Sequence, residues 1–354
     1  KNNYSFKVLT FKPNYISRLF KTKMASTYKD DPKVDVTRID FFDFGIAALF
    51  PTRTVIEFFL ICNLLIHSIW FMTFNSKKYR IIHANDYVTA AVAFVLSKLF
   101  TKKWVMSHHS IFPYFRNSLR LAIGRALLKQ AGAIFANSET VKKQLNIGLG
   151  KNRPPVIVAH YWINHNFFKP KDKIKARENL GLPKDAFIVM FLGRLEIAKG
   201  VGEFIKASKM GDDICFVITG PGEEYDLVKN STSKQLIYLG VKEGEELIDC
   251  YNAADACCFP TVAIEAFGRV AIEALSCGTP VIVSTTATKE IIDGSVGMRT
   301  KPVAKSIIMT ISAFRQKFGK RDMANVCREF AMKNYNENNA SAIIKEYERL
   351  LKAK

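Results

Sequence analysis

The chain has 354 residues, and its formal charge of +20 comes from 52 Lys and Arg against 32 Asp and Glu. With 48% hydrophobic and 24% charged residues it has the composition of an ordinary globular protein, which excludes a disordered tail, a collagen and a small disulfide scaffold. Residues 1–170 carry 25 basic and 8 acidic side chains, whereas residues 171–354 carry 27 and 24. The first half is therefore expected to meet an anionic partner, and nucleic acid, a membrane surface and a phosphorylated substrate are all open at this point.

The elements of the first half alternate between short apolar runs and helical patterns. Strands separated by helices of this length predict βαβ units and a parallel sheet. The predicted strands are residues 6–11, 80–84, 104–107, 133–136 and 156–159. The predicted helices are residues 86–100, 118–130 and 139–145.

One apolar segment, Val55 to Phe74, is long enough to span a bilayer. It holds Glu57 near one end and the polar residues Asn63 and His67 nearer the middle. These side chains favour a buried helix, or one that lies along a membrane surface, over a helix that spans the membrane. The seven cysteines form no C-x-x-C pair, which predicts reduced thiols in a cytosolic protein.

The second half begins after a polar stretch, residues 168–183, which is predicted to be a linker with a short helix. A second alternating series predicts another parallel sheet, so the fold class is α/β, with two doubly wound domains in tandem and a ligand site in the cleft between them. The predicted strands are residues 187–192, 214–219, 236–239, 256–259 and 280–284. The predicted helices are residues 200–209, 243–252, 268–276, 306–318 and 338–351.

Two carboxylates flank the predicted start of one of these helices, near Gly268. Glu265 lies on the loop before the helix and Glu273 lies in its second turn. The N-terminus of a helix offers free N–H groups and a positive dipole end, which suit a diphosphate. A carboxylate set back from it can accept hydrogen bonds from ribose or sugar hydroxyls. Two solvated glutamates around an ordinary helix remain the alternative interpretation.

Cations and glycines follow other strands of the same domain. Arg194 and Lys199 lie in one strand-to-helix loop after Gly193, and two cations so spaced can straddle a phosphate pair. Gly220 and Gly222 directly follow another strand, where glycines let a ligand approach the backbone closely. A G-x-G triplet alone is weak evidence.

Taken in order, the motifs FLGRL…KG, Gly-Pro-Gly, YLG, YNAADACCFP and EAFGRVAIEALSCGTPVI resemble the carboxyl-terminal domain of the retaining glycosyltransferases of family 4, the glycosyl transferases group 1. The first half is similar more loosely, through RIIHAND, KWVMSHH and AIFANSETVKKQL. The resemblance implies the GT-B fold, in which two Rossmann-like domains face a central cleft and a last helix crosses back to the first domain. The expected parts are an acceptor-side domain (1–168), a linker (169–184), a nucleotide-sugar domain (185–330) and the crossing helix (331–354).

The resemblance also implies transfer of a hexose from a nucleotide-sugar to a glycan or lipid-linked acceptor, with retention of configuration and without a metal or other cofactor. By motif, Arg194 and Lys199 hold the donor diphosphate, with Gly193, Gly220 and Gly222 in the donor-binding loops. Glu273 binds the ribose. A front-face mechanism, in which the leaving phosphate helps to deprotonate the acceptor, is implied as well.

The sugar itself is expected to contact Glu265, with the backbone N–H groups of Phe267 and Gly268 near sugar and phosphate. His109 matches a histidine that faces the sugar from the first domain, although its neighbour His108 is an alternative one residue away. The chain has no D-x-D triplet, the usual carboxylate pair for a nucleotide-bound metal, so the residues independently favour a metal-free site. The charge of the leaving group would then be met by the two cations and the helix end.

Two departures from the family pattern are expected to matter. No Gly-Gly pair precedes Glu290, in the stretch TTATKEIIDG, where the family places a backbone contact to the donor. The family's opening strand and glycine-rich loop are not found before YSFKVLTF, which resembles the second strand, so the chain is expected to lack its first βα unit and to be weakly active or inactive as it stands.

Two other functions remain open. One is another GT-B enzyme, such as a sugar-nucleotide epimerase or a phosphorylase. The other is a non-catalytic protein that binds nucleic acid through its basic half, but the lysine pairs of that half are scattered and no nucleic-acid motif accompanies them. The basic first half and the apolar segment 55–74 favour an anionic membrane surface over nucleic acid, with the protein cytoplasmic and peripheral on the membrane.

Overall fold

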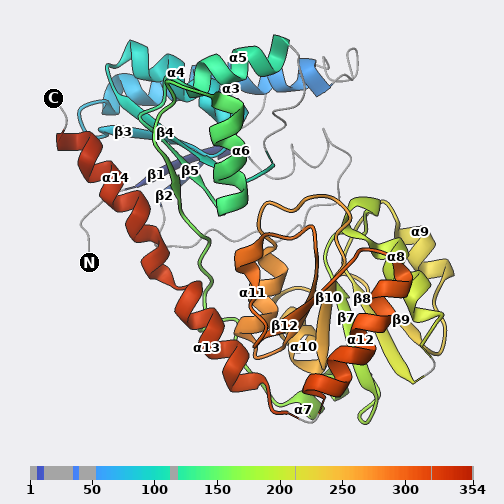
Figure 1. The fold of residues 1–354 in the computed structure, drawn as a ribbon. Helices are drawn as coiled ribbons and strands as arrows, with labels where there is room; N and C mark the ends of the chain where they lie inside the picture. Colours follow the sequence, from blue (N-terminus) through green and yellow to red (C-terminus); the bar gives the residue numbers. More distant parts are fainter. Residues whose placement is uncertain are drawn as a thin grey trace.

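A computed structural model of the chain describes residues 6–11, 35–39, 53–111, 119–211, 213–319 and 321–352, and the structural statements below concern these residues. It has two α/β domains, each built on parallel strands (Figure 1). The prediction of two parallel-sheet domains is confirmed.

The second domain holds a six-stranded parallel sheet in the order β12-β11-β10-β7-β8-β9. Its inner strands are almost wholly buried runs of apolar residues, as expected for a parallel sheet covered by helices on both faces. The strands are β7 (Phe187–Leu192), β8 (Ile214–Thr219), β9 (Leu236–Tyr238), β10 (Ala256–Phe259), β11 (Val281–Ser284) and β12 (Gly297–Thr300).

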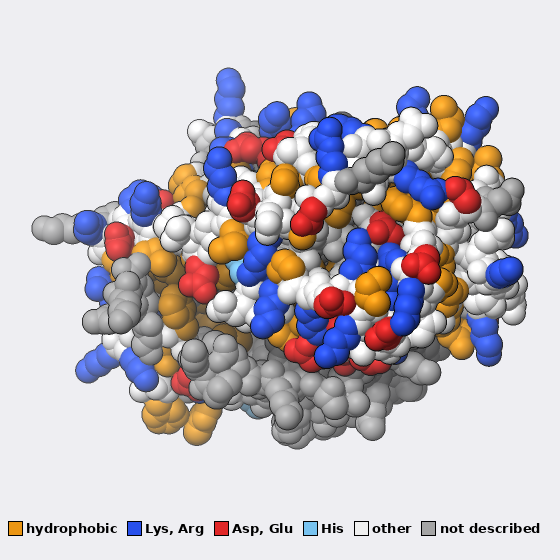
Figure 2. All heavy atoms as spheres, turned by 90° about the horizontal axis from the view of Figure 1, so that it is seen from below, with side chains coloured by type: hydrophobic (Ala, Val, Ile, Leu, Met, Phe, Trp, Pro, Cys, Tyr) orange, Lys and Arg blue, Asp and Glu red, His pale blue; other side chains and the backbone are white. Residues whose placement is uncertain are grey.

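Helices of the second domain form two contacting groups. One group is α8 (Val201–Ser208), α9 (Tyr225–Asn230) and α12 (Ala304–Phe318). The other is α7 (Lys173–Asn179), α10 (Gly244–Ala253), α11 (Arg269–Ser276) and α13 (Ala324–Asn334). Figure 2 shows blue and red side chains interspersed on the face seen from below, which agrees with the nearly balanced charge of this half.

The first domain has a four-stranded parallel sheet in the order β3-β4-β5-β6 and a separate parallel pair, β1-β2. A cavity of about 150 Å³ lies between β1 and β3, with Leu9 and Ile82 in its wall. The strands are β1 (Lys7–Phe11), β2 (Asp35–Ile39), β3 (Ile81–Ala84), β4 (Lys103–His108), β5 (Ala133–Ala136) and β6 (Val156–Val158). The helices are α3 (Arg53–Asn75), α4 (Tyr87–Leu99), α5 (Leu119–Leu128) and α6 (Glu139–Leu149).

The last helix, α14 (Ser341–Lys352), crosses from the second domain to the first, after the short 3-10 helix η3 (Glu337–Ala340) (Figure 1). Tyr347 and Leu350 of α14 lie in a buried cluster with Phe135 of β5. Gly132 makes room for the helix, because a Cβ atom there would lie 2.8 Å from the Leu350 side chain. The predicted crossing helix is therefore present, and its apolar face completes the core of the first domain.

The stretch predicted as a linker packs onto the second domain. Its helix α7 contacts α10. The buried guanidinium of Arg177 forms an ion pair of 2.8 Å with Asp255, and Lys171 is paired at 2.8 Å with Asp249. Its polar composition and prolines made this segment resemble a linker, whereas Lys171, Lys173 and Arg177 are neutralised by acidic residues far away in sequence.

Among the α-helices and strands that the structure describes, four were missed by the sequence patterns: β2, β12, α9 and α13. Three of them have six residues or fewer, whereas α13 has 11. Strand β12 reads GMRT, which carries no strand periodicity. It forms because it pairs with β11 at the edge of an existing sheet, a non-local cause that a local pattern does not contain.

Helix α3 coincides with the apolar segment of the first domain. Among the described residues it is the one helix long and apolar enough to cross a membrane, over Phe58–Asn75. One stripe packs against α4 and is buried, with Leu60, Leu64, Ser68 and Met72. The opposite stripe is apolar and exposed.

Candidate functional site

Two loops that follow neighbouring strands of the second domain cross in direct backbone contact. The Leu195 N–H donates to Pro221 O at 2.7 Å. A Cβ at Gly220 would lie 1.9 Å from Gly193 O, and one at Gly222 would lie 2.3 Å from Leu195 O. Glycine is therefore required at 220 and 222 for loop packing, a role the sequence did not indicate. At Gly193 nothing lies within 4 Å of such a Cβ, so space is open there.

Lys199 and Glu265 meet at the carboxyl ends of the strands, where Lys199 Nζ lies 2.6 Å from Glu265 Oε1. Lys199 ends the short 3-10 helix η1 (Ile197–Lys199), which the loop after β10 touches. Gly200 allows this approach, because its φ is 79° and a Cβ would lie 2.0 Å from Pro260 O. The two side chains are 29% and 13% exposed, so the pair is largely sheltered but reachable.

Arg194, which is predicted to straddle a phosphate pair together with Lys199, has a different partner from Lys199. Its guanidinium is 66% exposed and forms an ion pair with Glu196. No hydrogen bond or ion pair between described residues joins it to Lys199 or Glu265. The structure therefore places one of the two cations in the sheltered pair and leaves the other at the surface.

Helix α11 begins beside this pair. Gly268 is its N-cap, with φ 101° and no side-chain cap, and a Cβ there would lie 3.2 Å from Glu265 Oε2. The positive φ and the close carboxylate explain why glycine stands at this position. Glu265 is thus held beside the N–H groups that open the helix.

Glu273, one turn into α11, accepts a hydrogen bond of 2.6 Å from the hydroxyl of Tyr251. Burial raises the pKa of Glu273, whereas the Tyr251 hydroxyl and Arg269, 3.9 Å away, partly offset that rise. Tyr251 was not singled out from the sequence, because a tyrosine in YNAAD resembles any buried core residue.

The first domain contributes His109, the first residue after β4. Its Nδ1 lies 2.7 Å from the hydroxyl of Tyr161, and the two rings are stacked, 5.5 Å between centroids. Tyr161 also contacts Phe267 at 5.0 Å, and Arg269 lies 5.9 Å over its ring. These contacts link the histidine of one domain to the loop and helix start of the other.

Of the two adjacent histidines, His109 is exposed and His108 is buried, 2% exposed, with its ring 5.4 Å from that of Tyr87. Burial lowers the pKa of His108 to about 4. Desolvation also lowers the pKa of His109, against the opposing charge of Asp86. His109 is the member of the pair that can reach a ligand.

A second contact between the domains involves Glu290. Its Oε1 accepts a hydrogen bond of 2.6 Å from the Glu139 N–H, at the N-terminus of α6, and its carbonyl accepts one of 2.7 Å from the Tyr335 hydroxyl. The loop before Glu290, where the family's glycines are missing, has no residue with positive φ. The Arg299 guanidinium donates to its carbonyls instead.

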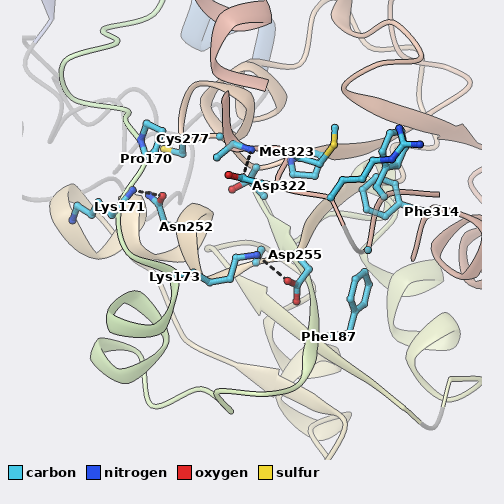
Figure 3. Close-up of a pocket in the computed structure, with 18 residues that line it drawn as sticks. Pro170, Lys171, Lys173, Phe187, Asn252, Asp255, Cys277, Phe314, Asp322 and Met323 are labelled. Atoms are coloured by element: carbon cyan, nitrogen blue, oxygen red, sulfur yellow. Dashed lines mark hydrogen bonds and ion pairs between the residues drawn. The ribbon is translucent and has the colours of Figure 1, made fainter. Parts of the chain in front are cut away.

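A cavity of about 290 Å³ lies at the opposite end of the second domain, and Figure 3 shows its lining. Phe187 and Pro280, at the amino ends of their strands, help to line it. Its Lys173 is already paired with Asp255 at 2.9 Å. In a parallel sheet with crossover helices, ligands bind at the carboxyl ends, so the Lys199–Glu265 region is the candidate site and this cavity is not.

Comparisons with known proteins find a family model and several relatives that resemble this chain. Residues 172–311 match the family described as Glycosyl transferases group 1. The second domain is therefore similar to the glycosyl transferases group 1. D-inositol 3-phosphate glycosyltransferase 1 of Catenulispora acidiphila is 28% identical over 233 residues, 58% of this chain and 55% of that protein. The chain thus spans about half the length of such curated relatives.

Solved structures similar to the whole chain show the fold. Sucrose-phosphate synthase of Thermosynechococcus elongatus has a TM-score of 0.77 at 22% identity, covering 98% of this chain and 89% of that one. The Anabaena protein HepE, in complex with UDP, has a TM-score of 0.72 at 20% identity, covering 90% and 86%. The expected GT-B fold is confirmed: two Rossmann-like domains, with the last helix returning to the first.

Proposed function

We propose that the chain transfers a hexose from a nucleotide-sugar to a glycan or lipid-linked acceptor, with retention of anomeric configuration. The likeness of residues 172–311 to the glycosyl transferases group 1 supports transfer of a sugar. The observation that carries the assignment of the site is the Lys199–Glu265 pair at the start of α11, opposite His109 and Tyr161. The Anabaena neighbour, whose structures hold UDP and UDP-glucose, supports a nucleotide-sugar as donor.

In this proposal the donor diphosphate lies at the N-terminus of α11. Lys199 has three N–H donors and gives one to Glu265, so its ammonium can also bind a phosphate oxygen. As the glycosidic oxygen leaves with the phosphate, the ammonium and the helix N–H groups stabilise the growing negative charge. Arg194 would add its charge by turning from Glu196 toward the phosphate.

The sugar would lie between Glu265 and His109, on the two sides of the domain junction. Glu265 would accept hydrogen bonds from sugar hydroxyls, and Glu273 from the ribose. A leaving phosphate that takes the acceptor proton would give the retained configuration without a covalent enzyme intermediate. In the part of the chain that the structure describes, no three His, Cys, Asp or Glu residues are grouped so that they could hold a metal ion. We propose transfer without a metal or other cofactor.

The acceptor is proposed to be presented at an anionic membrane surface, with the protein on its cytoplasmic face and the first domain toward the lipid. The excess of positive charge in residues 1–170 supports this orientation. Nucleic acid is not a proposed partner.

A thermal-shift panel of UDP-, GDP- and ADP-sugars tests the donor site. A ligand that binds only the folded state raises the melting temperature as its concentration increases. We expect one donor class to do so, and Lys199→Ala to reduce its shift while Lys206→Ala, on the exposed face of α8, leaves it unchanged. If all three classes leave the melting temperature unchanged, the proposed function is wrong.

A further inference from the structure

Helix α3 carries apolar side chains on two opposite stripes, whereas the usual amphipathic helix has one apolar and one polar face. Positions 60, 64, 68 and 72 face the protein and include a serine. The outward stripe consists of Phe58, Ile66, Trp70 and Phe74, which are 60%, 67%, 70% and 69% exposed. We call these four residues the outer stripe. A solvent-facing helix surface is ordinarily polar, so four large and mostly exposed apolar side chains on one face indicate a partner.

The outer stripe ends in a basic segment. Trp70 and Phe74 are in edge contact, with centroids 5.0 Å apart, and Lys77, Lys78 and Arg80 follow within six residues. No ion pair between described residues neutralises these three cations. Residues 53–111 as a whole carry seven Lys and Arg against two Asp and Glu. The charge next to the apolar row therefore complements an anionic surface.

These two features fit a lipid interface better than a protein. An interfacial helix lies in the membrane plane with Trp, Phe and Ile among the acyl chains and with cations at the headgroups. The buried stripe holds α3 against α4, and so favours a helix that lies on the surface over one that spans the bilayer. Four apolar residues on one face of the helix allow that face to insert a short way into the lipid while the opposite face stays packed on the protein.

We propose that the outer stripe of α3 inserts into the interface of an anionic lipid bilayer and anchors the first domain there. This deepens the proposed function, because it names the surface that meets the membrane, but it rests on the structure of α3 and not on the transfer reaction.

The test is flotation of the purified full chain with vesicles of phosphatidylcholine alone or with phosphatidylglycerol. Wild-type protein is expected to float with the anionic vesicles. The double variant W70S/F74S is expected to lose at least tenfold in partition coefficient, since two large apolar side chains no longer enter the lipid. The matched control V303S/M309S removes two exposed apolar side chains from the second domain and is expected to bind as wild type does.

The cations are tested separately. K77Q/K78Q is expected to weaken binding about fivefold per lysine and to reduce its salt dependence. In a W162F background, the fluorescence of Trp70 is expected to shift to the blue on binding and to be quenched by brominated lipid, whereas Trp104, 3% exposed, stays unchanged.

Three results would overturn the proposal. W70S/F74S could float as wild type does, or neither vesicle could bind the wild-type protein. Light scattering could instead find a dimer that W70S/F74S converts to monomer, which would assign the outer stripe to a second copy of the chain. Donor thermal shifts measured on the same samples distinguish these failures from failure of the proposed function, because W70S/F74S leaves the Lys199–Glu265 region untouched.

Discussion

The second domain and the first differ in what holds their shape. The second has one continuous buried core around six strands, while the described part of the first has three smaller clusters around four strands and a separate pair. In the second, backbones approach so closely that a Cβ at Gly200 or Gly220 would lie about 2 Å from a carbonyl oxygen. The family match also lies within the second domain. Close backbone packing fixes the loops at the carboxyl ends of the second domain's strands, where we propose that the donor binds.

The largest expected effect tests the second domain. Lys199→Ala removes the ammonium that we place on the diphosphate, so kcat/KM for the donor should fall about 10²- to 10³-fold, as for other single groups that stabilise transition-state charge. Steady-state transfer assays measure this, with Lys206→Ala as control. An unchanged kcat/KM would assign the pair with Glu265 to structure alone.

The next effect tests how far the first domain depends on the end of the chain. Tyr347→Ala empties a site between Phe135 and His83 and should lower the free energy of unfolding by about 3 kcal/mol. Tyr347→Phe, which loses only the hydroxyl bound to His83, should cost about 1 kcal/mol. Urea unfolding followed by fluorescence of buried Trp104 measures both. Equal stability of Tyr347→Ala and wild type would show that α14 is not part of that core.

A pH effect should also be concentrated in the first domain. Burial lowers the pKa of His83 and of His108 from 6.5 to about 4. Between these values the unfolded chain binds more protons than the folded one, so stability falls as the pH falls from 6.5 toward 4. The loss at pH 5 should be about 2 kcal/mol per histidine. Urea titrations at pH 7 and pH 5 measure it, and a flat profile would contradict the burial argument.

The smallest effect concerns the contact between the domains. Glu290→Gln replaces the carboxylate at the N-terminus of α6 with a neutral amide and should weaken the contact by about 1 kcal/mol. The donor KM should rise about threefold to fivefold, and small-angle scattering should find a larger radius of gyration. Glu139→Gln is the matched control, since Glu139 contributes only its backbone N–H to this contact. If Glu139→Gln raised the donor KM more than Glu290→Gln does, the carboxylate of Glu290 would not be the group that holds this contact.

The sequence predicted most strands and helices because their apolar periodicity is local. The strands 187–192, 214–219, 256–259 and 133–136 were bounded to the residue. The elements it missed, such as β12 and α9, are short and owe their structure to neighbours far along the chain. The packing of residues 169–184 onto the second domain was missed for the same reason.

The candidate site was predicted in part. Lys199 and Glu265 were chosen separately from motifs, and the structure places them 2.6 Å apart. Their roles, like those of Arg194 and His109, stay predictions. Tyr161, which stacks on His109, gave no signal, because it follows β6 in a run with no motif and acts only through contacts between domains. The stacking of His109 on Tyr161 can be recognised only from the tertiary structure, because the two residues follow different strands, β4 and β6.

The packing of α14 on the first domain has a consequence for biosynthesis. Gly132 and Phe135 belong to the middle of the first domain, yet the side chains that cover them come from Tyr347 and Leu350. On a ribosome, the first domain leaves the exit tunnel long before these residues are made, with part of its sheet still uncovered. It can complete its core only after Tyr347 and Leu350 have been made, so the first half of the chain is exposed to chaperones and to aggregation while the second half is being translated.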